Sequence, residues 1–214
     1  MNTRVLLVDD HAVVREGYKR LLERTREFDV IAEAASGEDA YRAFCEHSPD
    51  VVVMDINLPG TSGIETMRRM LARAPEAKVL VFSMYEEALF GARALQAGAC
   101  GYVTKASAPE VLVDAVRAVI AGRVYLSHDI AHQLALQSAA HQCLPLSELS
   151  PREFEVFRLL AEGKPLSEIA GILSLSQKTV ANYQSLVKQK LEADTSAQMV
   201  WIALKHGLVG SAGE

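Results

Sequence analysis

The sequence predicts an α/β domain followed by an all-α domain. In the first 122 residues, short apolar runs alternate five times with amphipathic stretches, a pattern typical of a parallel sheet covered by helices. Beyond residue 146 no strand pattern occurs, and apolar residues recur at helical spacing. Five βα units fit a flavodoxin-like, doubly wound, five-stranded parallel sheet, and the later segment fits four helices.

The elements of the first part can be placed along the chain. The expected strands cover residues 5–8, 30–34, 51–54, 79–82 and 101–103. The expected helices cover residues 12–25, 37–47, 63–73, 86–96 and 108–121. A further amphipathic stretch at 126–137, with Ser127 as a candidate N-cap, runs into a segment with one proline and no clear period. We therefore expect a first domain over residues 1–122, a linker helix and linker over 123–146, and a second domain over 147–214.

In the second domain we expect helices at 151–162, 166–173, 177–191 and 196–206. The stretch Ser150-Pro-Arg-Glu153 matches a capping box with proline at the first helical position, which is a strong start signal. Gly163 ends that helix, and Ser176 begins the third.

Composition narrows the class of protein. Half of the 214 residues are hydrophobic and 23% are charged, as in ordinary soluble domains. No apolar run is long enough to cross a membrane and the N-terminus lacks a signal-peptide core, so we expect a cytoplasmic protein without membrane contact. The net charge of −5 gives no global argument for nucleic-acid binding. Cys45, Cys100 and Cys143 are widely separated, which favours reduced, mostly buried thiols over disulfides or a zinc site.

Chemically active side chains follow four of the five expected strands. Asp9 and Asp10 come after the first strand and Asp55 after the third, while Ser83 and Lys105 follow the fourth and fifth. In a doubly wound sheet the carboxyl ends of neighbouring strands converge on one crevice. We therefore expect three carboxylates, a hydroxyl and an ammonium to meet there.

Such a set suits phosphoryl transfer. Clustered carboxylates repel one another unless a cation joins them, and Mg²⁺ prefers a few carboxylates completed by water and phosphate. Asp55 could accept a phosphoryl group whose oxygens Ser83 and Lys105 would hold. The plainer alternative is that acids end strands because loops are polar, but it does not account for five groups placed by strand order.

Separate motifs carry a family resemblance over residues 1–122. The stretches "VLLVDDH", "VVVMDINLPGTSG", "VLVFS" and "GYVTK" resemble the receiver domain of two-component response regulators, in order and spacing. The resemblance implies that Asp55 is the phosphoacceptor. It also implies that Mg²⁺ is bound directly by Asp10 and Asp55, through water by Asp9, and by the backbone carbonyl of Asn57.

The same resemblance assigns the remaining groups of the first domain. Ser83 and Lys105 would contact the phosphoryl oxygens, and Tyr102, three residues before the lysine, corresponds to the aromatic switch position. An ordinary amphipathic tyrosine at a strand end is the alternative for Tyr102. Ala106 stands where many receivers carry proline, so we do not expect a cis peptide there.

Residues 166–191 have the pattern of a helix, a tight turn and a second helix. Apolar faces are formed by Ile169, Ala170 and Leu173 in the first helix and by Val180, Leu186 or Val187, and Leu191 in the second. Small residues at 170 and 171 would let the helices cross closely. This is helix-turn-helix spacing, in which the second helix enters the DNA major groove.

The charge of this region supports DNA binding only locally. Residues 174–191 hold Lys178, Lys188 and Lys190 and no acid, and their other polar side chains are mainly amides and hydroxyls. Lysines can neutralise phosphates, and amides can recognise base edges. A solvated surface helix is the alternative that periodicity leaves open.

A second resemblance covers residues 147–209. The stretch "LSPREFEVFRLLAEGKPLSEIAGILSLSQKTVANYQSLVKQKL", through "WIALKHGLV", resembles the four-helix DNA-binding domain of LuxR-type regulators. Together the two domains resemble the NarL/FixJ subfamily of response regulators. The resemblance implies a recognition helix at 176–190, whose expected DNA-contacting residues are Lys178, Thr179, Ala181, Asn182, Tyr183, Ser185, Lys188 and Lys190.

One position and one helix qualify this resemblance. Ala181 stands where relatives often carry lysine, which weakens the inference of DNA binding. The last helix looks like the family's dimer-forming helix, and its apolar residues could form the dimer seam or the domain's own core: Met199, Val200, Ile202 and Ala203.

We interpret the chain as a phosphorylation-controlled transcription factor. A sensor histidine kinase would phosphorylate Asp55, and the protein would bind promoter DNA as a homodimer, with RNA polymerase as a further partner. Phosphorylation would pull in Ser83 and reposition Tyr102, and relatives imply that the receiver covers the recognition helix in the off state. We expect no turnover of an external substrate.

Two rival interpretations remain. A haloacid-dehalogenase-like phosphatase also uses an aspartate nucleophile, but usually places it two residues from a second aspartate after the first strand, whereas Asp9 and Asp10 are adjacent. The other rival is an interaction protein whose second domain binds another protein instead of DNA. The uncharged Ala181 favours it, as does the net charge of −1 from Leu144 onward, with seven Lys/Arg and eight Asp/Glu.

Overall fold

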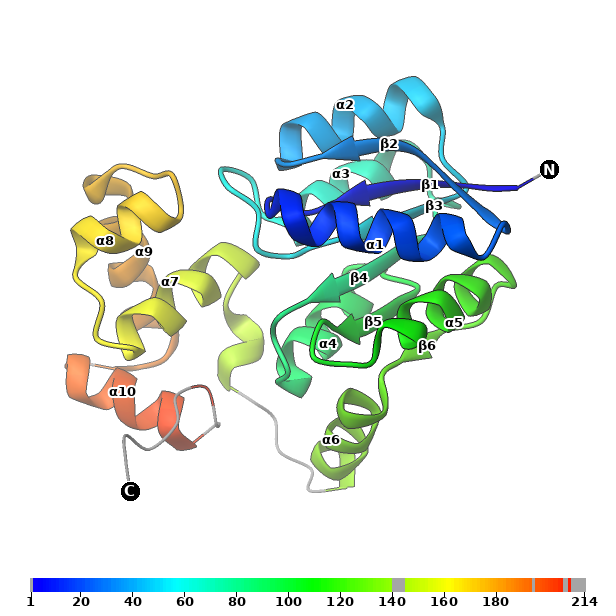
Figure 1. Ribbon diagram of the computed structural model, residues 1–214. Helices are drawn as coiled ribbons and strands as arrows, with labels where there is room; N and C mark the ends of the chain where they lie inside the picture. Colours follow the sequence, from blue (N-terminus) through cyan, green and yellow to red (C-terminus); the bar gives the residue numbers. More distant parts are fainter. Residues whose placement is uncertain (1, 140–144, 194, 206–207, 209–214) are drawn as a thin grey trace. The chain divides into compact units, whose positions relative to one another are not determined.

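The computed structural model describes residues 2–139, 145–193, 195–205 and 208. The chain divides into two compact units, Met1–Ala140 and His141–Glu214 (Figure 1). The first unit contains the parallel sheet, and the second consists of helices.

The sheet of the first unit confirms the doubly wound fold and adds one strand. The strands are β1 (Thr3–Val8), β2 (Phe28–Ala34), β3 (Val51–Met54), β4 (Val79–Ser83), β5 (Gly101–Thr104) and β6 (Tyr125–Leu126). They lie in the order β2-β1-β3-β4-β5-β6, and every neighbouring pair is parallel. The unexpected β6 has only two residues, too few for an alternating or continuous apolar pattern to predict.

Helices cover this sheet. They are α1 (Ala12–Arg24), α2 (Gly37–His47), α3 (Gly63–Arg73), α4 (Ala88–Gln96), α5 (Pro109–Ile120) and α6 (His128–Ala139). Figure 1 shows α1 and α5 in front of the sheet and α3 behind it. The buried cluster under α1 and α5 joins their side chains, such as Leu22 and Val116, to inward-facing strand residues such as Val5, Val53 and Leu80.

Two helices begin two residues later than the sequence predicts. Helix α4 begins at Ala88, two residues later than expected. Helix α6 begins at His128 because Leu126 pairs with Tyr102 in the sheet. Ser127 therefore directly precedes α6, as expected of an N-cap, but its hydroxyl is buried and has no hydrogen-bond partner among the described residues.

The second unit has the four expected α-helices. A short 3₁₀ helix, η1 (Pro145–Glu148), precedes α7 (Pro151–Ala161), α8 (Leu166–Ile172), α9 (Gln177–Lys190) and α10 (Ser196–Lys205). The capping box is confirmed, because the Ser150 hydroxyl accepts from the Glu153 N–H and the Glu153 carboxylate accepts from the Ser150 N–H. Ser176 caps α9 by accepting from the Thr179 N–H at 3.0 Å.

The core of the second unit lies between α7, α8 and α9. It contains the predicted Ile169, Ala170, Leu173 and Val180, together with Val156 and Leu159. Of the two alternatives at 186 and 187, the valine is buried and the leucine is 43% exposed. The expectation that Gly171 allows the helices to cross closely is wrong, because a side chain there would meet nothing within 4 Å.

Cys45 and Cys100 are free, half-buried thiols, and Cys143 lies outside the described residues. Within the described ranges, none of the helices has the length and apolar character needed to cross a membrane.

Candidate functional site

The sheet places two of the predicted carboxylates on adjacent strand ends. Strands β1 and β3 are neighbours, and the strand order reverses at this pair. Asp9 and Asp55 follow these strands directly, and the Asp55 N–H donates to the carbonyl of Val8 at 3.0 Å. Because ligands of doubly wound sheets bind where the order reverses, the predicted site lies in the crevice that such folds use.

Lys105 joins both carboxylates. Its Nζ donates to Oδ2 of Asp9 at 2.6 Å and to Oδ2 of Asp55 at 2.5 Å, and each of the three side chains is at most 4% exposed. We refer to Asp9, Asp55 and Lys105 as the acid–lysine cluster. It is a cation held between two anions at the end of the sheet, assembled from residues up to 96 positions apart.

Burial and charge act in opposite directions within this cluster. Burial raises the pKa of the Asp55 carboxyl, and the opposing attraction of Lys105 does not cancel this rise. Burial lowers the pKa of the Lys105 ammonium, but the attraction of Asp55 and Asp9 outweighs it and the pKa is raised. Additional positive charge near Asp55 would therefore stabilise its ionised form.

Ser83 is the last residue of β4, and Tyr102 lies within the neighbouring strand β5. Both are fully buried. The Lys105 N–H donates to the Ser83 carbonyl at 2.7 Å, and the Ser83 hydroxyl accepts from the Tyr85 N–H at 3.4 Å. The Tyr102 phenol points inward and donates to the Tyr85 carbonyl at 2.9 Å. Burial raises the pKa of that phenol well above its ordinary value, so the hydroxyl stays protonated and remains a donor.

The loop after β3 positions Asp55 and requires a glycine. The Gly63 N–H donates to the Ile56 carbonyl at 2.9 Å, which folds the loop back on the strand end. A Cβ at Gly63 would lie 1.9 Å from the backbone oxygen of Asp55, so only glycine fits. The Asn57 N–H donates to Oδ1 of Asp55 at 3.1 Å and fixes the carboxylate from the other side.

The predicted magnesium ligands are only partly brought together. Among the described residues, the group whose potential ligand atoms lie within 4.8 Å of one another is Asp9, Asp10 and His11. Asp55 instead faces Lys105, whose ammonium occupies the position of a cation between two carboxylates. Buried carboxylate oxygens that share one cation fit a hard divalent ion, provided that the lysine shifts toward another anion.

His11 is a site residue that the sequence prediction missed. Its Nδ1 lies 2.7 Å from Oδ1 of Asp10 and 3.4 Å from Oδ1 of Asp9, and its backbone N–H donates to Oδ1 of Asp9 at 2.8 Å. The available signal was its place directly after two aspartates at a strand end.

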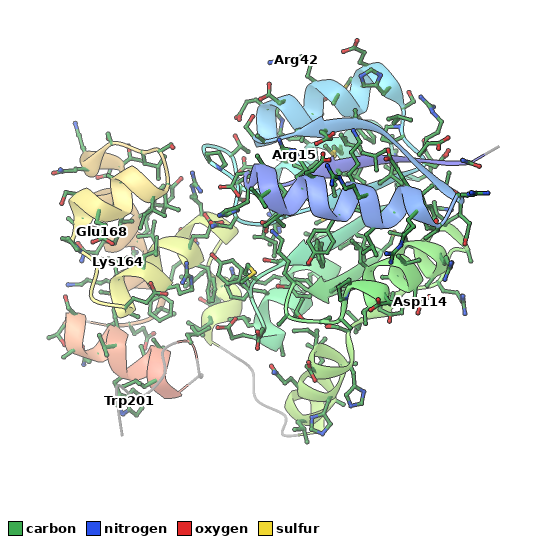
Figure 2. All side chains as sticks on the ribbon, in the orientation of Figure 1. Arg15, Arg42, Asp114, Lys164, Glu168 and Trp201 are labelled. Carbon is green, nitrogen blue, oxygen red and sulfur yellow. The ribbon has the colours of Figure 1, made fainter. Side chains whose placement is uncertain are left out.

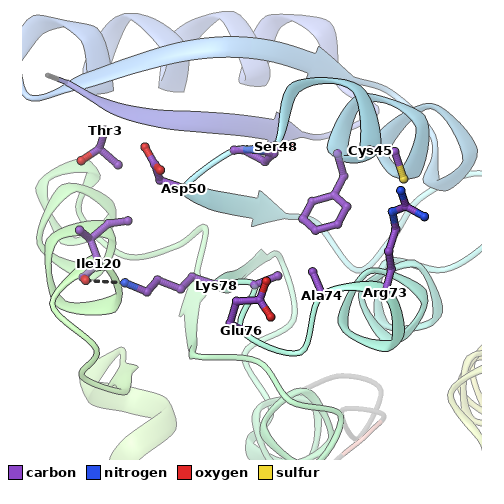
Figure 3. A pocket seen from close by; sticks show the side chains of 12 residues that line it. Thr3, Cys45, Ser48, Asp50, Arg73, Ala74, Glu76, Lys78 and Ile120 are labelled. Atoms are coloured by element: carbon purple, nitrogen blue, oxygen red, sulfur yellow. Dashed lines mark hydrogen bonds between the residues drawn. The ribbon is translucent and has the colours of Figure 1, made fainter.

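A separate cavity of about 640 Å³ lies at the amino ends of the strands, away from Asp9 and Asp55. Figure 3 shows its lining, in which Thr3, Asp50 and Lys78 precede or begin strands β1, β3 and β4. The Lys78 ammonium donates to the Ile120 carbonyl at the end of α5 (2.6 Å). None of the predicted site residues lines this cavity.

In the second unit, α9 presents part of the predicted DNA-contacting set. Lys178, Asn182 and Ser185 are exposed, while Thr179, Ala181 and Lys188 are half-buried. Tyr183 packs against the core of α7, α8 and α9. The exposed positions are those that remain open to a ligand.

Lys190 is engaged within its own unit. Its ammonium donates to Oε2 of Glu153 at 2.7 Å and to the Glu148 carbonyl at 3.2 Å. Burial raises the pKa of Glu153, but Lys190 and the Ser150 N–H outweigh it and hold the pKa below its ordinary value. The charge of Lys190 is therefore partly balanced by Glu153 within the unit.

Helix α10 turns a different face outward from the one predicted for a dimer seam. Met199 and Ala203 are buried in the unit's core, and Val200 and Ile202 are half-buried. Trp201 and Leu204 are the exposed large apolar residues, at 62% and 45% (Figure 2 labels Trp201). Met199 and Ala203 therefore belong to the domain's own core, which is the alternative that the sequence left open, and Trp201 and Leu204 are the large apolar side chains that α10 exposes.

The first unit is a doubly wound sheet with the acid–lysine cluster where the strand order reverses, and the second is a helix-turn-helix unit. This combination defines the class of two-domain regulators that join a receiver domain to a helix-turn-helix domain. Residues 5–117 match the family described as response regulator receiver domain, and residues 147–203 match the bacterial regulatory proteins of the luxR family. The chain belongs to the LuxR-type response regulators of the NarL/FixJ subfamily.

Known relatives span nearly the whole chain. The transcriptional activator protein ExaE of Pseudomonas putida is 43% identical over 96% of this chain and 97% of its own length. The response regulator GacA of Pseudomonas aeruginosa is 39% identical over 98% of this chain and 99% of its own. RcsB of Salmonella enterica serovar Typhimurium, solved bound to promoter P1flhDC with the phosphomimetic BeF₃⁻, is 27% identical, with a TM-score of 0.68 over 94% of this chain and 98% of that one.

Proposed function

We propose that this protein is a phosphorylation-dependent transcriptional regulator, with a phosphoacceptor domain over 1–122, a linker over 123–146 and a DNA-binding domain over 147–214. A sensor histidine kinase would phosphorylate Asp55 in the cytoplasm. The observation that carries the proposal is the acid–lysine cluster, in which a buried Asp55 already holds an ammonium at 2.5 Å. That ammonium can transfer from the carboxylates to an incoming phosphoryl group.

The chemical step requires only positioning and charge. A carboxylate oxygen of Asp55 forms a bond to phosphorus while the bond from phosphorus to the donor's leaving group breaks. Lys105 pairs with the phosphoryl oxygens, and the Ser83 hydroxyl donates to one of them. Asp9, Asp10, Asp55 and the Asn57 carbonyl would hold Mg²⁺, which when bound neutralises charge on those oxygens.

A chain of hydrogen bonds through Ser83, Tyr85 and Tyr102, which we call the switch region, supports a mechanism by which phosphorylation of Asp55 changes the structure. The Ser83 hydroxyl accepts from Tyr85, and the Tyr85 carbonyl accepts from Tyr102. Turning Ser83 toward a phosphoryl group breaks the first of these bonds and loosens the loop that holds Tyr102 inward. Phosphorylation then shifts an existing equilibrium between two arrangements of this loop.

DNA recognition is assigned to the exposed side of α9. Lys178 would contact a phosphate, and Asn182 and Ser185 would face base edges. The solved complexes of RcsB with promoter DNA support this use of the related domain. We assign Lys190 a structural role instead of the predicted DNA contact, because its ammonium forms an ion pair with Glu153.

We also propose that α10 forms the dimer seam through Trp201 and Leu204. These side chains expose apolar surface on one helix, and a two-fold axis would pair the helix with its copy. Trp201→Ala should shift sedimentation of the phosphorylated protein toward monomer, whereas Ala197→Ser, at an exposed position of the same helix, should leave it unchanged. Equal sedimentation of the two variants would rule out this seam.

The function is tested by DNA binding measured with and without acetyl phosphate. Selection from a random DNA pool supplies the site, and a gel shift then compares wild type with Asp55→Asn. We expect acetyl phosphate to tighten binding by the wild type and to leave Asp55→Asn unchanged. Equal affinity in both states of the wild type would contradict phosphate control.

A protein-binding role for the second domain is the alternative, and two observations favour it. Ala181 carries no charge, and the charge of Lys190 is partly neutralised by Glu153. Salt separates the two functions, since DNA binding through several lysines weakens steeply as ionic strength rises. Failure of the pool to yield any bound sequence would favour the protein-binding role.

A further inference from the structure

Helix α6 and the residue directly before it are joined to the switch region and to α4 by three contacts. The N–H of Ser127, the residue before the helix, donates to the backbone carbonyl of Tyr102 at 2.9 Å. Ile130 is fully buried against Gly91 of α4, where an added Cβ would lie 2.7 Å from its Cγ2. The Gln133 side chain accepts from the Ala88 N–H at 2.9 Å.

The contact of Gln133 replaces a helix cap. The first N–H groups of an α-helix have no partner inside the helix and need one from outside. Glu87, at the N-cap position of α4, makes no capping hydrogen bond with its side chain. Gln133 instead supplies an acceptor from 45 residues further along the chain, so the start of α4 depends on α6.

The start of α4 also belongs to the switch. The ring of Tyr85 stacks on that of Phe90 in α4, with centroids 4.1 Å apart and an angle of 8° between the planes. The carbonyl of Tyr85 accepts from the Tyr102 phenol. The loop between β4 and α4, the Tyr102 side chain and the first turn of α4 are therefore one connected group. Ser127, directly before α6, contacts this group at Tyr102, and Gln133 of α6 contacts it at Ala88.

We propose that α6 stabilises the unphosphorylated arrangement of this switch and undocks when Asp55 is phosphorylated, with Ile130 and Gln133 as its positioning residues. The inference rests on the proposed function. It names α6, the helix that follows the last strand of the receiver, as the element through which phosphorylation acts on the rest of the chain. When Ser83 and Tyr102 move, the Ala88 N–H and the Gly91 surface shift with them and the α6 contacts are lost. Because linkage is reciprocal, weakening these contacts favours the phosphorylated arrangement by the same factor.

Hydrogen exchange of the full-length protein tests the undocking directly. Amides are compared with and without Mg²⁺ and beryllofluoride, which stands in for the phosphoryl group. We expect α6 amides to exchange about tenfold faster with beryllofluoride, while amides of α1 stay unchanged. Altered exchange between Ser83 and Ala88 with no change in α6 would overturn this inference and leave the proposed function standing. No change in either region would contradict both this inference and the proposed function.

Variants test the reciprocal effect. Gln133→Ala removes the acceptor, and Gly91→Ala places a methyl group against Ile130 while improving helix propensity in α4. Each should bind beryllofluoride about fivefold more tightly than wild type, an effect that general loss of structure does not produce. Leu136→Ala, at a 58% exposed position of the same helix, is the matched control and should bind as wild type does. Unchanged or weaker binding by Gln133→Ala and Gly91→Ala would refute the coupling.

Discussion

Nζ of Lys105 lies 2.5 Å from Oδ2 of Asp55, and both side chains are only 4% exposed. Burying two charges costs desolvation free energy that the pair does not fully regain, so such a pair is weak evidence for stability. In the proposed function, this arrangement keeps a carboxylate and an ammonium in place for an incoming phosphoryl group. We therefore expect the buried Asp55 carboxylate to lower the stability of the folded protein, and this effect can be measured.

Asp55→Asn should stabilise the protein at neutral pH. A carboxyl whose pKa is raised in the folded state adds stability when protonated, and that stability is lost as pH rises through the folded pKa. The amide removes this loss, so we expect Asp55→Asn to gain about 1 kcal/mol at pH 7 and to approach wild type near about pH 4. Urea unfolding at the two pH values measures this.

Asp114→Asn provides the control for that experiment, because this aspartate is 61% exposed and its change should stay within about 0.5 kcal/mol. Wild type as stable as Asp55→Asn at pH 7 would contradict the prediction.

Gly63→Ala should damage both stability and phosphorylation. The new Cβ would lie 1.9 Å from the Asp55 backbone oxygen, so the loop must move and carry the carboxylate with it. We expect a loss of about 3 kcal/mol in the free energy of unfolding. Gly171→Ala is the matched control: with open space around that position in α8, it should gain up to about 1 kcal/mol. Similar effects of the two changes would show that the close approach at Gly63 is unimportant.

Glu153→Gln should destabilise the second unit in a pH-dependent way. A carboxyl with a lowered folded pKa contributes stability above its ordinary pKa and loses it as pH falls through the folded value. We expect a loss of about 1 kcal/mol at pH 7 that disappears below about pH 4. The fluorescence of Trp201, the chain's single tryptophan, reports unfolding of this unit. A difference that stays constant with pH would exclude the ion pair with Lys190 as its cause.

Lys178 and Lys190 should contribute unequally to DNA binding. Lys178 is exposed on α9, whereas Glu153 holds Lys190. Lys178→Ala should lower the slope of log affinity against log salt by about 1, and Lys190→Ala should lower it clearly less. Affinity measured over a range of salt concentrations gives both slopes. Equal slopes for the two variants would mean that Lys190 leaves Glu153 to contact phosphate.

The strand ends could be predicted from sequence because parallel strands place their carboxyl ends along one edge. Asp9, Asp55 and Lys105 needed only strand order to be brought together. The engagement of Lys105 by the carboxylates could not be predicted, since it depends on side-chain directions. Neither could the bond between Glu153 and Lys190, which joins two helices far apart in sequence.

For α10 the sequence left two alternatives open, a dimer seam and the domain's own core. Residues 199–204 are apolar without interruption, so alternation of polar and apolar side chains within this stretch cannot reveal which side points outward. In the structure α10 packs against α7, with Met199 and Ala203 buried and Trp201 exposed. The two-residue strand β6 was missed because so short an element leaves no periodic signal.

The central claim is that Asp55 accepts a phosphoryl group, and its most direct test is mapping that group after incubation with acetyl phosphate and Mg²⁺. We predict one phosphoryl group per chain, on the peptide that contains Asp55, and none when Mg²⁺ is chelated or in Asp55→Asn. A phosphoryl group found on another residue of the wild type, or an unchanged yield in Asp55→Asn, would contradict the account.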